Sequence, residues 1–241
     1  MKNNNQKRKF LEEVAKNYDA SDENEFDYYY RKYHYENIKD QLSGDKLLEF
    51  GSGTGLSTYY LTQLSKDVTV VEGSINNIAK AKENFDLEKV NFINKLWEEF
   101  DTTERFTDIF FVDALQLIEN HKEMILFLSN FLQSDGRIHL IVPNSHSFHR
   151  MLGVEMGLIS SITDLSPNDK KYDSVKDFSW TGIRELVSDI NLYIVHESPI
   201  LFKPFDGDTL LNLTKLQIEG LFKIATSFKE YCSHMYFVVE K

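Results

Sequence analysis

The chain has 241 residues and a formal net charge of −11, and it contains a single cysteine. This length suits one domain with a sizeable core, and the acidic balance excludes general nucleic-acid binding, because phosphate repels an acidic surface. A single cysteine cannot form an internal disulfide, and this predicts a reducing, cytoplasmic location. No apolar run approaches the length of a membrane span.

The N-terminal part of the chain predicts two helices. Residues 1–5 are polar and are expected to be disordered, whereas apolar residues recur at helical spacing from Phe10 to Ala15. A tyrosine-rich stretch, residues 28–35, then leads into Ile38 and Leu42 on one helical face. The tyrosines either pack against the edge of a sheet or form a lid over a ligand.

A glycine-rich turn follows the first predicted strand. The apolar run Leu47–Phe50 contains an acid, Glu49, and is followed by glycines at three alternate positions and by a helix over Leu56–Leu64. Glycine tolerates positive φ and lets a ligand approach the backbone. The N-terminus of the helix offers unpaired N–H groups to a polar group. The pattern predicts a ligand site at the end of this strand.

The second predicted strand, Val68–Glu72, ends in another acid. Its β-branched run is typical of a strand buried on both faces. An acid at this position can accept the hydroxyls of a ribose, so a nucleoside-containing ligand is expected across the two strand ends. A dinucleotide fingerprint, G-x-G-x-x-G, would need glycine where Leu56 stands. A nicotinamide-dependent oxidoreductase is therefore a weaker alternative.

The pattern E-x-G-x-G-x-G over residues 49–55 resembles motif I of the class I S-adenosylmethionine-dependent methyltransferases, and Val71–Ser74 resembles the motif that follows it. The resemblance implies S-adenosylmethionine as cofactor. It also implies that an N-terminal aromatic segment covers the cofactor, with His34 or Arg31 pairing with its carboxylate. The cofactor-binding residues implied by the two motifs are Glu49, Gly51, Ser52, Gly53, Gly55, Glu72, Gly73 and Ser74.

Two further segments follow the third and fourth predicted strands. Leu96 and Trp97 come after the predicted strand Val90–Ile93. Many family members carry an acid at this position, and some carry an apolar residue followed by an aromatic one. Trp97 either stacks on the adenine of the cofactor or belongs to the core. Asp113 follows Phe106–Val112 and begins a segment that resembles the family's H-V-L-E-H-V. Gln116 and Leu117 replace its Glu and second His, so no base is carried over. Asp113 is predicted beside the cofactor or the acceptor.

The fifth strand is predicted over residues 137–142, after a helix over 123–132 and a turn at 135–136. The following segment, residues 143–153, resembles P-N-x-x-S-L-H-R-R-L-G of a bacterial methyltransferase group linked to surface-sugar and natural-product pathways. Its His149 is the candidate base and its Arg150 a candidate for holding an anionic acceptor. The alternative is an outward, solvated pair. Lys176 stands in a segment that resembles the group's G-H-R-R and keeps one positive charge.

The last part of the chain predicts a helix over 180–189, a strand over 192–197, a long helix over 210–228 and a final strand over 235–239. Alternating strands and helices predict an α/β fold with a mostly parallel sheet. The resemblance implies a Rossmann-like sheet of seven strands in the order 3-2-1-4-5-7-6. We expect one domain over 1–241, with a helical cap (1–43), a cofactor core (44–142), an acceptor-side insertion (143–190) and a C-terminal part (191–241).

The resemblance implies methyl transfer from S-adenosylmethionine to a small polar acceptor, with O-methylation of a sugar, nucleotide-linked or phosphate-like compound in bacterial surface-polysaccharide or related biosynthesis expected. A hydroxyl acceptor needs a base such as His149, whereas an already ionised oxygen does not. The alternative is a noncatalytic cofactor-binding or partner protein, because Asp113, Leu117 and Ser174 depart from the family pattern. No metal site is predicted, and the sequence leaves the oligomeric state open.

Overall fold

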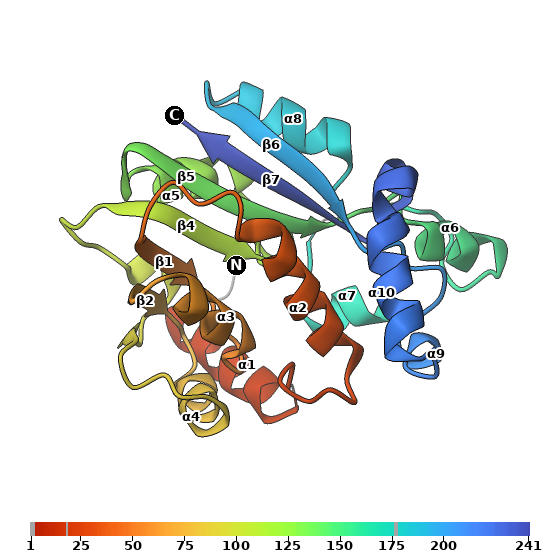
Figure 1. Cartoon of the computed structure of the whole chain (residues 1–241), viewed down its shortest axis with the longest axis horizontal. Coiled ribbons are helices and arrows are strands. Elements are labelled where there is room, and N and C mark those ends of the chain that lie inside the picture. The colour runs from red at the N-terminus through yellow and green to blue at the C-terminus, as the bar shows by residue number, and fades with distance from the viewer. Residues whose placement is uncertain (1–2, 18, 176–177) are drawn as a thin grey trace. The chain divides into compact units, whose positions relative to one another are not determined.

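The computed structural model describes residues 3–17, 19–175 and 178–241 (Figure 1). Within them, seven strands form a sheet in the order β3-β2-β1-β4-β5-β7-β6. The pairs β1–β2, β2–β3 and β1–β4 are parallel, and β7 is antiparallel to both β5 and β6. This is the predicted class I methyltransferase fold. The chain divides into two compact units, with the division passing through β4 and β5, and each unit is described by itself. The expected single domain and its four segments stay a prediction.

The first unit comprises residues 1–111 and 131–137. Its strands β1 and β2 are almost entirely buried, as strands covered on both faces should be. Figure 1 shows α3 and α4 beside these strands, and α1 packs on α4 while α2 packs on α3. Its elements are α1 (Asn4–Asn17), α2 (Phe26–Ile38), β1 (Lys46–Phe50), α3 (Leu56–Leu64), β2 (Asp67–Val71), α4 (Ile75–Asn84), β3 (Asn91–Ile93), the 3₁₀ turn η1 (Trp97–Glu99) and β4 (Phe106–Val112) up to Phe111.

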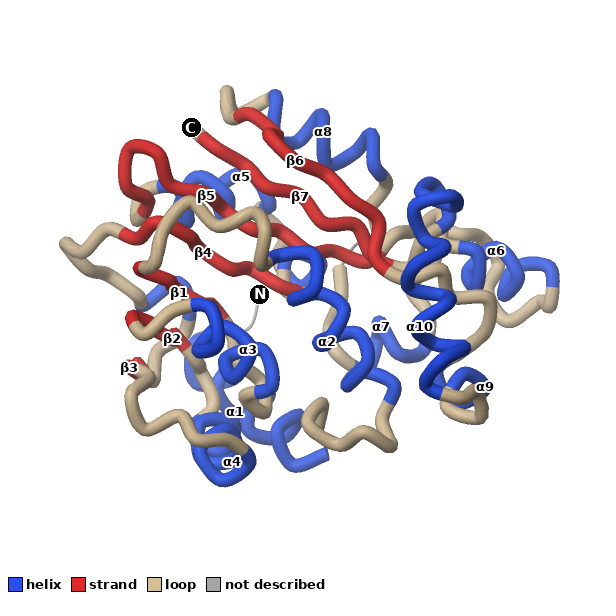
Figure 2. The backbone as a smooth tube through the Cα atoms, viewed as in Figure 1, coloured by secondary structure: helices blue, strands red, loops and turns tan. Residues whose placement is uncertain are grey.

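The second unit comprises residues 112–130 and 138–241. Strand β7 is its centre, because Met235–Val239 is completely buried and pairs with β5 on one side and β6 on the other. Figure 2 shows these three strands as neighbours, with α8 next to β6. Its elements are η2 (Leu115–Leu117), α5 (His121–Ser129), β5 (Leu132–Pro143) from Ile138, α6 (Phe148–Glu155), α7 (Pro167–Lys171), α8 (Trp180–Ser188), β6 (Tyr193–Ile200), α9 (Gly207–Leu210), α10 (Lys215–Ile224), η3 (Ala225–Tyr231) and β7 (His234–Glu240).

The predicted turn at residues 135–136 is wrong. Helix α5 ends at Ser129, and β5 runs without a break from Leu132 through Gly136. A Cβ atom on Gly136 would lie 3.0 Å from the carbonyl oxygens of Phe106 and Thr107. The glycine therefore permits two backbones within the sheet to approach closely. Close backbone approach is a common reason for a glycine inside a strand.

The long helix predicted over residues 210–228 is also wrong, because two interruptions divide it. Thr214 starts a new helix with a capping box: its hydroxyl accepts from the Gln217 N–H at 3.3 Å, and the Gln217 side chain accepts from the Thr214 N–H at 2.8 Å. Phe228 then leaves helical geometry, with φ −121°. At the other end of the chain, the start expected to be disordered is helical from Asn4.

Gly55 is required by packing in the first unit. It precedes α3 with φ +92°, and a Cβ atom there would lie 2.5 Å from Cβ and 2.8 Å from Cα of Ala81 in α4. We expect Gly55→Ala to lower the free energy of unfolding by about 3 kcal/mol, from backbone strain and overpacking together. Urea unfolding measures this loss.

Gly220 provides the matched control for this substitution. It lies inside α10, and apart from its chain neighbours and the backbone of its own helix no described atom lies within 4 Å of a Cβ atom built on it. Because alanine is the better helix former, Gly220→Ala should leave stability unchanged or raise it by up to about 1 kcal/mol. Equal losses in the two variants would contradict the packing role of Gly55.

Candidate functional site

The glycine turn lies where two parallel strands of the first unit end together. Phe50 and Val71 are paired at the ends of β1 and β2, and the Gly51 N–H donates to the Val71 carbonyl oxygen at 2.9 Å. Gly51 and Gly53 have φ values of +85° and +51°. These left-handed conformations are readily available to glycine. The predicted strand, turn and helix are confirmed.

Glu72 joins this turn to the loop after β2. Its carboxylate is buried and accepts from the Gly53 N–H at 3.3 Å and the Ser74 N–H at 2.8 Å, with Asn77 Nδ2 at 3.4 Å. Burial raises the pKa of this carboxyl, while hydrogen bonds from Ser74, Asn77, Gly53 and Ser52 lower it. The structure thus brings Glu72, Ser52, Gly53 and Ser74 together, as the two motifs predicted.

Glu49 is a second buried acid at the same edge. One of its oxygens accepts from the Thr58 hydroxyl at 2.6 Å, and the other, Oε1, is enclosed without a hydrogen-bond partner among the described residues. Burial raises its pKa to about 8; Thr58 and the positive charge of Arg31 lower it, and Glu72 raises it further. A buried polar atom left without a partner suits a position where a ligand supplies one.

The raised pKa of Glu49 predicts a pH-dependent stability. The folded protein holds this proton more tightly than the unfolded chain, so the stabilisation is complete below pH 4.5 and is lost as the pH rises to about 8. Between these limits the ligand-free chain should lose up to about 1.4 kcal/mol per pH unit through this group. Urea unfolding across that range should show a flatter profile in Glu49→Gln, while the exposed Glu83→Gln keeps the parental slope. Parallel profiles in Glu49→Gln and the parent would contradict the assignment.

Leu96 and Trp97 border the same turns. A Cβ atom on Gly73 would lie 3.1 Å from the buried Leu96 side chain, and one on Gly51 would lie 3.5 Å from the Trp97 indole. Trp97 is half-buried and meets Phe111 edge-on, with ring centroids 5.0 Å apart. It therefore packs on Phe111 and borders the glycine turn, and its stacking on adenine stays a prediction.

The tyrosine-rich segment forms α2 in the first unit. Tyr29, Tyr30 and Tyr35 are buried, and Tyr35 stacks on Tyr60 of helix α3, not of a strand, with ring centroids 5.2 Å apart. His34 is completely buried, with its ring 6.2 Å from that of Tyr30. The neighbouring Arg31 is the cation whose charge acts on Glu49.

Helix α1 makes contacts that the sequence did not suggest. The Glu12 carboxylate accepts from the Ser74 hydroxyl and the Ile75 N–H, both at 2.8 Å, and so caps α4. Leu11 lies so close to Gly73 that a Cβ atom there would meet it at 2.6 Å. Helix α1 therefore covers the loop that follows β2. No local pattern marks a helical glutamate as the cap of a helix far along the chain.

Asp113 follows β4 in the second unit. Its backbone is left-handed, with φ +49°, and its N–H donates to the Ile141 carbonyl oxygen at 2.9 Å. Its Oδ1 lies 3.5 Å from Nε2 of His234, a residue that the sequence analysis did not select. Few residues other than glycine adopt this conformation, and aspartate does so more readily than most.

His149 and Arg150 have different surroundings on α6. His149 is partly accessible, but its Nδ1 is enclosed and has no hydrogen-bond partner in the described chain. Burial holds the pKa of His149 well below 6.5, and the charges of Lys203, His234 and Arg150 lower it further. The imidazole is therefore neutral at physiological pH and can accept a proton.

Arg150 is buried, and its guanidinium is occupied by protein groups rather than facing outward. It binds the Asp169 carboxylate at 3.1 Å, the Ile162 carbonyl oxygen at 3.1 Å and the Asp164 carbonyl oxygen. These bonds hold the segment after α6, so the solvated alternative is wrong for this residue. Its predicted contact with an anionic acceptor remains untested, and Lys176 lies outside the described residues.

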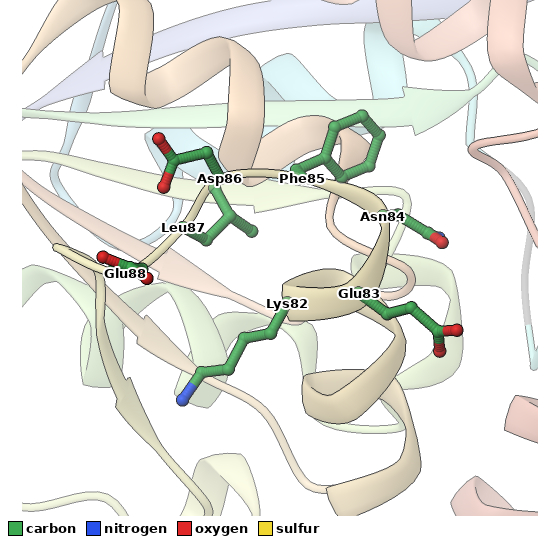
Figure 3. Close-up of a pocket in the computed structure, with 7 residues that line it drawn as sticks. All are labelled: Lys82, Glu83, Asn84, Phe85, Asp86, Leu87 and Glu88. Atoms are coloured by element: carbon green, nitrogen blue, oxygen red, sulfur yellow. The ribbon is translucent and has the colours of Figure 1, made fainter.

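A surface hollow at Lys82–Glu88 does not belong to this site (Figure 3). It surrounds the C-terminal end of α4. This helix connects the end of β2 to the start of β3, which runs parallel to β2. The hollow therefore lies where the strands begin, whereas the glycine turn lies where they end.

Across the described parts of the chain, no cluster of three or more His, Cys, Asp or Glu side chains could hold a metal ion. No described helix is long and apolar enough to cross a membrane.

Comparison with known proteins identifies relatives with this fold. Residues 21–197 match the family described as "Methyltransferase domain". The ubiquinone biosynthesis O-methyltransferase of Rickettsia conorii is 25% identical over 182 residues, which cover 74% of this chain and 61% of that protein. The chain thus spans less than two thirds of that relative's length.

Solved methyltransferases share the fold at lower sequence identity. The plantazolicin methyltransferase BpumL, solved with S-adenosylhomocysteine and a desmethylPZN analog, is 17% identical, with a TM-score of 0.56 over 88% of this chain and 81% of that one. The N-methyltransferase NodS of Bradyrhizobium japonicum, also solved with S-adenosylhomocysteine, is 12% identical, with a TM-score of 0.58 over 90% and 88%.

Proposed function

The chain belongs to the class I S-adenosylmethionine-dependent methyltransferases, with S-adenosylmethionine as its cofactor, and from this membership we propose that it methylates an oxygen of a small polar acceptor. The observation that carries the proposal is the enclosed Nδ1 of His149, which has no hydrogen-bond partner among the described residues and belongs to a neutral imidazole. A hydroxyl acceptor would donate its proton there.

The first unit supplies groups that fit the cofactor. The Glu72 carboxylate would hold the ribose hydroxyls, and the turn at Gly51 and Gly53 would let the ligand approach the backbone. Leu96 and Trp97 would border the adenine, and Arg31 or His34 would pair with the carboxylate. The enclosed Oε1 of Glu49, without a partner in the described chain, supports a polar ligand here.

Bound S-adenosylmethionine supplies an electrophilic methyl group on a sulfonium whose leaving group is neutral. The chain's own residues therefore need to orient the acceptor and exclude water more than to protonate a leaving group. His149 would remove the hydroxyl proton, which is the one acid–base step that this chemistry requires of an alcohol.

The pathway is proposed from the segment after β5. Residues 143–153 resemble a bacterial group linked to surface-sugar and natural-product pathways, and we place this chain in surface-polysaccharide or related biosynthesis in the cytoplasm on that basis. The relatives are named for ubiquinone biosynthesis, for plantazolicin and for N-methylation, so their names do not select one acceptor.

The test is an acceptor screen with S-adenosylmethionine, read by formation of S-adenosylhomocysteine and by product mass. Sugars, nucleotide-sugars and phosphate-like compounds are each compared with an analogue in which an amine replaces the hydroxyl. We expect methyl transfer to the oxygen compounds. Methylation of the amines alone would overturn the oxygen assignment. Cofactor binding without turnover on any compound would favour the noncatalytic alternative, which the departures at Leu117 and Ser174 motivate.

A further inference from the structure

Three buried polar atoms of the second unit have no hydrogen-bond partner in the described chain. They are Gln116 Oε1, Ser147 Oγ and His149 Nδ1. Buried polar groups in folded proteins are nearly always paired, and three exceptions within one unit need an explanation. A polar ligand that supplies the missing partners provides one.

The backbone brings the segments that carry these three residues to the same edge of the sheet. Gln116 follows β4, whereas Ser147 and His149 follow β5, and the bond from the Asp113 N–H to the Ile141 carbonyl oxygen shows that both strands end at the same edge. Val175 bonds to one of these groups and Phe178 to the other. The Val175 N–H donates to the Gln116 carbonyl oxygen at 2.8 Å, and the Ser145 N–H donates to the Phe178 carbonyl oxygen at 2.7 Å.

His234 lies at this edge between a hydroxyl and a carboxylate. The Ser233 hydroxyl donates to the Ile200 carbonyl oxygen at 3.1 Å and can therefore only accept from His234 Nδ1, which lies 3.2 Å away. The other ring nitrogen, Nε2, faces the Asp113 carboxylate at 3.5 Å. Both nitrogens thus face acceptors, and only the imidazolium form of histidine can donate from both.

The charges that act on His149 are positive. They belong to Lys203, His234 and Arg150, from three separate parts of the chain. Arg150 is bound to Asp169, Lys203 also acts on Asp206, and Asp113 balances His234. An ammonium group beside His149 would be repelled by these cations, whereas an oxygen that becomes negative as its proton leaves would be stabilised.

Resting on the proposed function, we propose that Gln116, Ser147 and His149 line the acceptor site, and that Lys203 and His234 make it select a hydroxyl acceptor over an amine. The hydroxyl O–H bond breaks and its proton passes to Nδ1 of His149. The oxygen's electron pair forms the bond to the methyl carbon, and the pair of the broken carbon–sulfur bond stays on sulfur as a neutral thioether. The His149 imidazolium then returns its proton to water.

The test uses the imidazole resonances of the full-length chain, followed by NMR with and without S-adenosylhomocysteine. Two probes are compared, 4-nitrophenol, which carries an acidic hydroxyl, and benzylamine, which is an ammonium ion at neutral pH. At millimolar concentration 4-nitrophenol should shift the His149 and His234 resonances saturably, while benzylamine should not. His146, which is exposed, and His196 on β6 serve as internal references.

Two lysine variants complete the test. Lys203→Met should weaken 4-nitrophenol binding about tenfold, as expected for the loss of one charge-assisted contact. Lys223→Met, on an exposed lysine of α10, should leave it unchanged. Equal shifts with both probes, no shift of either histidine, or no effect of Lys203→Met would overturn the proposal. Binding of S-adenosylmethionine is measured separately by calorimetry. If the cofactor does not bind, the proposed function fails, whereas the shifts of the His149 and His234 resonances test the acceptor site independently.

Discussion

The Glu72→Ala variant should bind S-adenosylmethionine about a hundredfold more weakly than the parent chain. Two hydroxyl-to-carboxylate hydrogen bonds, each stronger than a neutral pair, account for a loss of this size. The carboxylate is already placed by the Gly53 and Ser74 N–H groups, so it needs no rearrangement to receive a ribose. Isothermal titration calorimetry gives the affinity.

Two further variants separate binding from folding in this experiment. Asp67→Ala removes an exposed acid at the opposite end of the same strand and should leave the affinity unchanged. Glu72→Gln keeps one oxygen acceptor and should lose less affinity than Glu72→Ala. Because Glu72 also joins two loops, urea unfolding must show that the variants are folded at the titration temperature. Parental affinity in folded Glu72→Ala would remove the ribose role.

The His149→Ala variant should lose turnover by roughly 10²- to 10⁴-fold, the usual contribution of a positioned general base. Its affinity for S-adenosylmethionine should stay close to that of the parent. Because the pKa of His149 lies well below 6.5, the base is unprotonated at neutral pH. Parental activity should therefore be flat through neutrality and fall only in acid, as the imidazole gains a proton.

His146→Ala is the matched control for this loss. His146 lies three residues earlier, is exposed, and contacts the Ser145 hydroxyl at 3.1 Å. Its replacement should leave turnover and the pH profile unchanged. Equal activity of His149→Ala and the parent on a hydroxyl acceptor would end the candidacy of His149 as the base.

The cofactor side of the fold could be predicted because its signals are local. Buried strands next to a glycine turn and an acid mark β1, β2 and α3, and the predicted helix Leu56–Leu64 agrees with the structure at both ends. Glu72 and Gly53 follow directly after their strands, so the parallel pairing of β1 with β2 is enough to bring them together.

The remaining features depend on contacts between distant parts of the chain. The sequence at Gly136 predicts a turn, and only the folded chain shows its strand against the backbone at Phe106. The three protein partners of Arg150 likewise become visible only in the folded chain. His234 begins a strand, and its contacts with Asp113 and Ser233 form only in the folded chain. No spacing rule connects residues that meet only in the folded chain.

Calorimetric titration of the full chain with S-adenosylmethionine, S-adenosylhomocysteine and NAD in parallel tests the central claim most directly. The account predicts that both sulfur compounds bind and that NAD does not, because Leu56 stands where a dinucleotide turn needs its third glycine. Failure of both sulfur compounds to bind in protein shown to be folded, or tight binding of NAD instead, would contradict it.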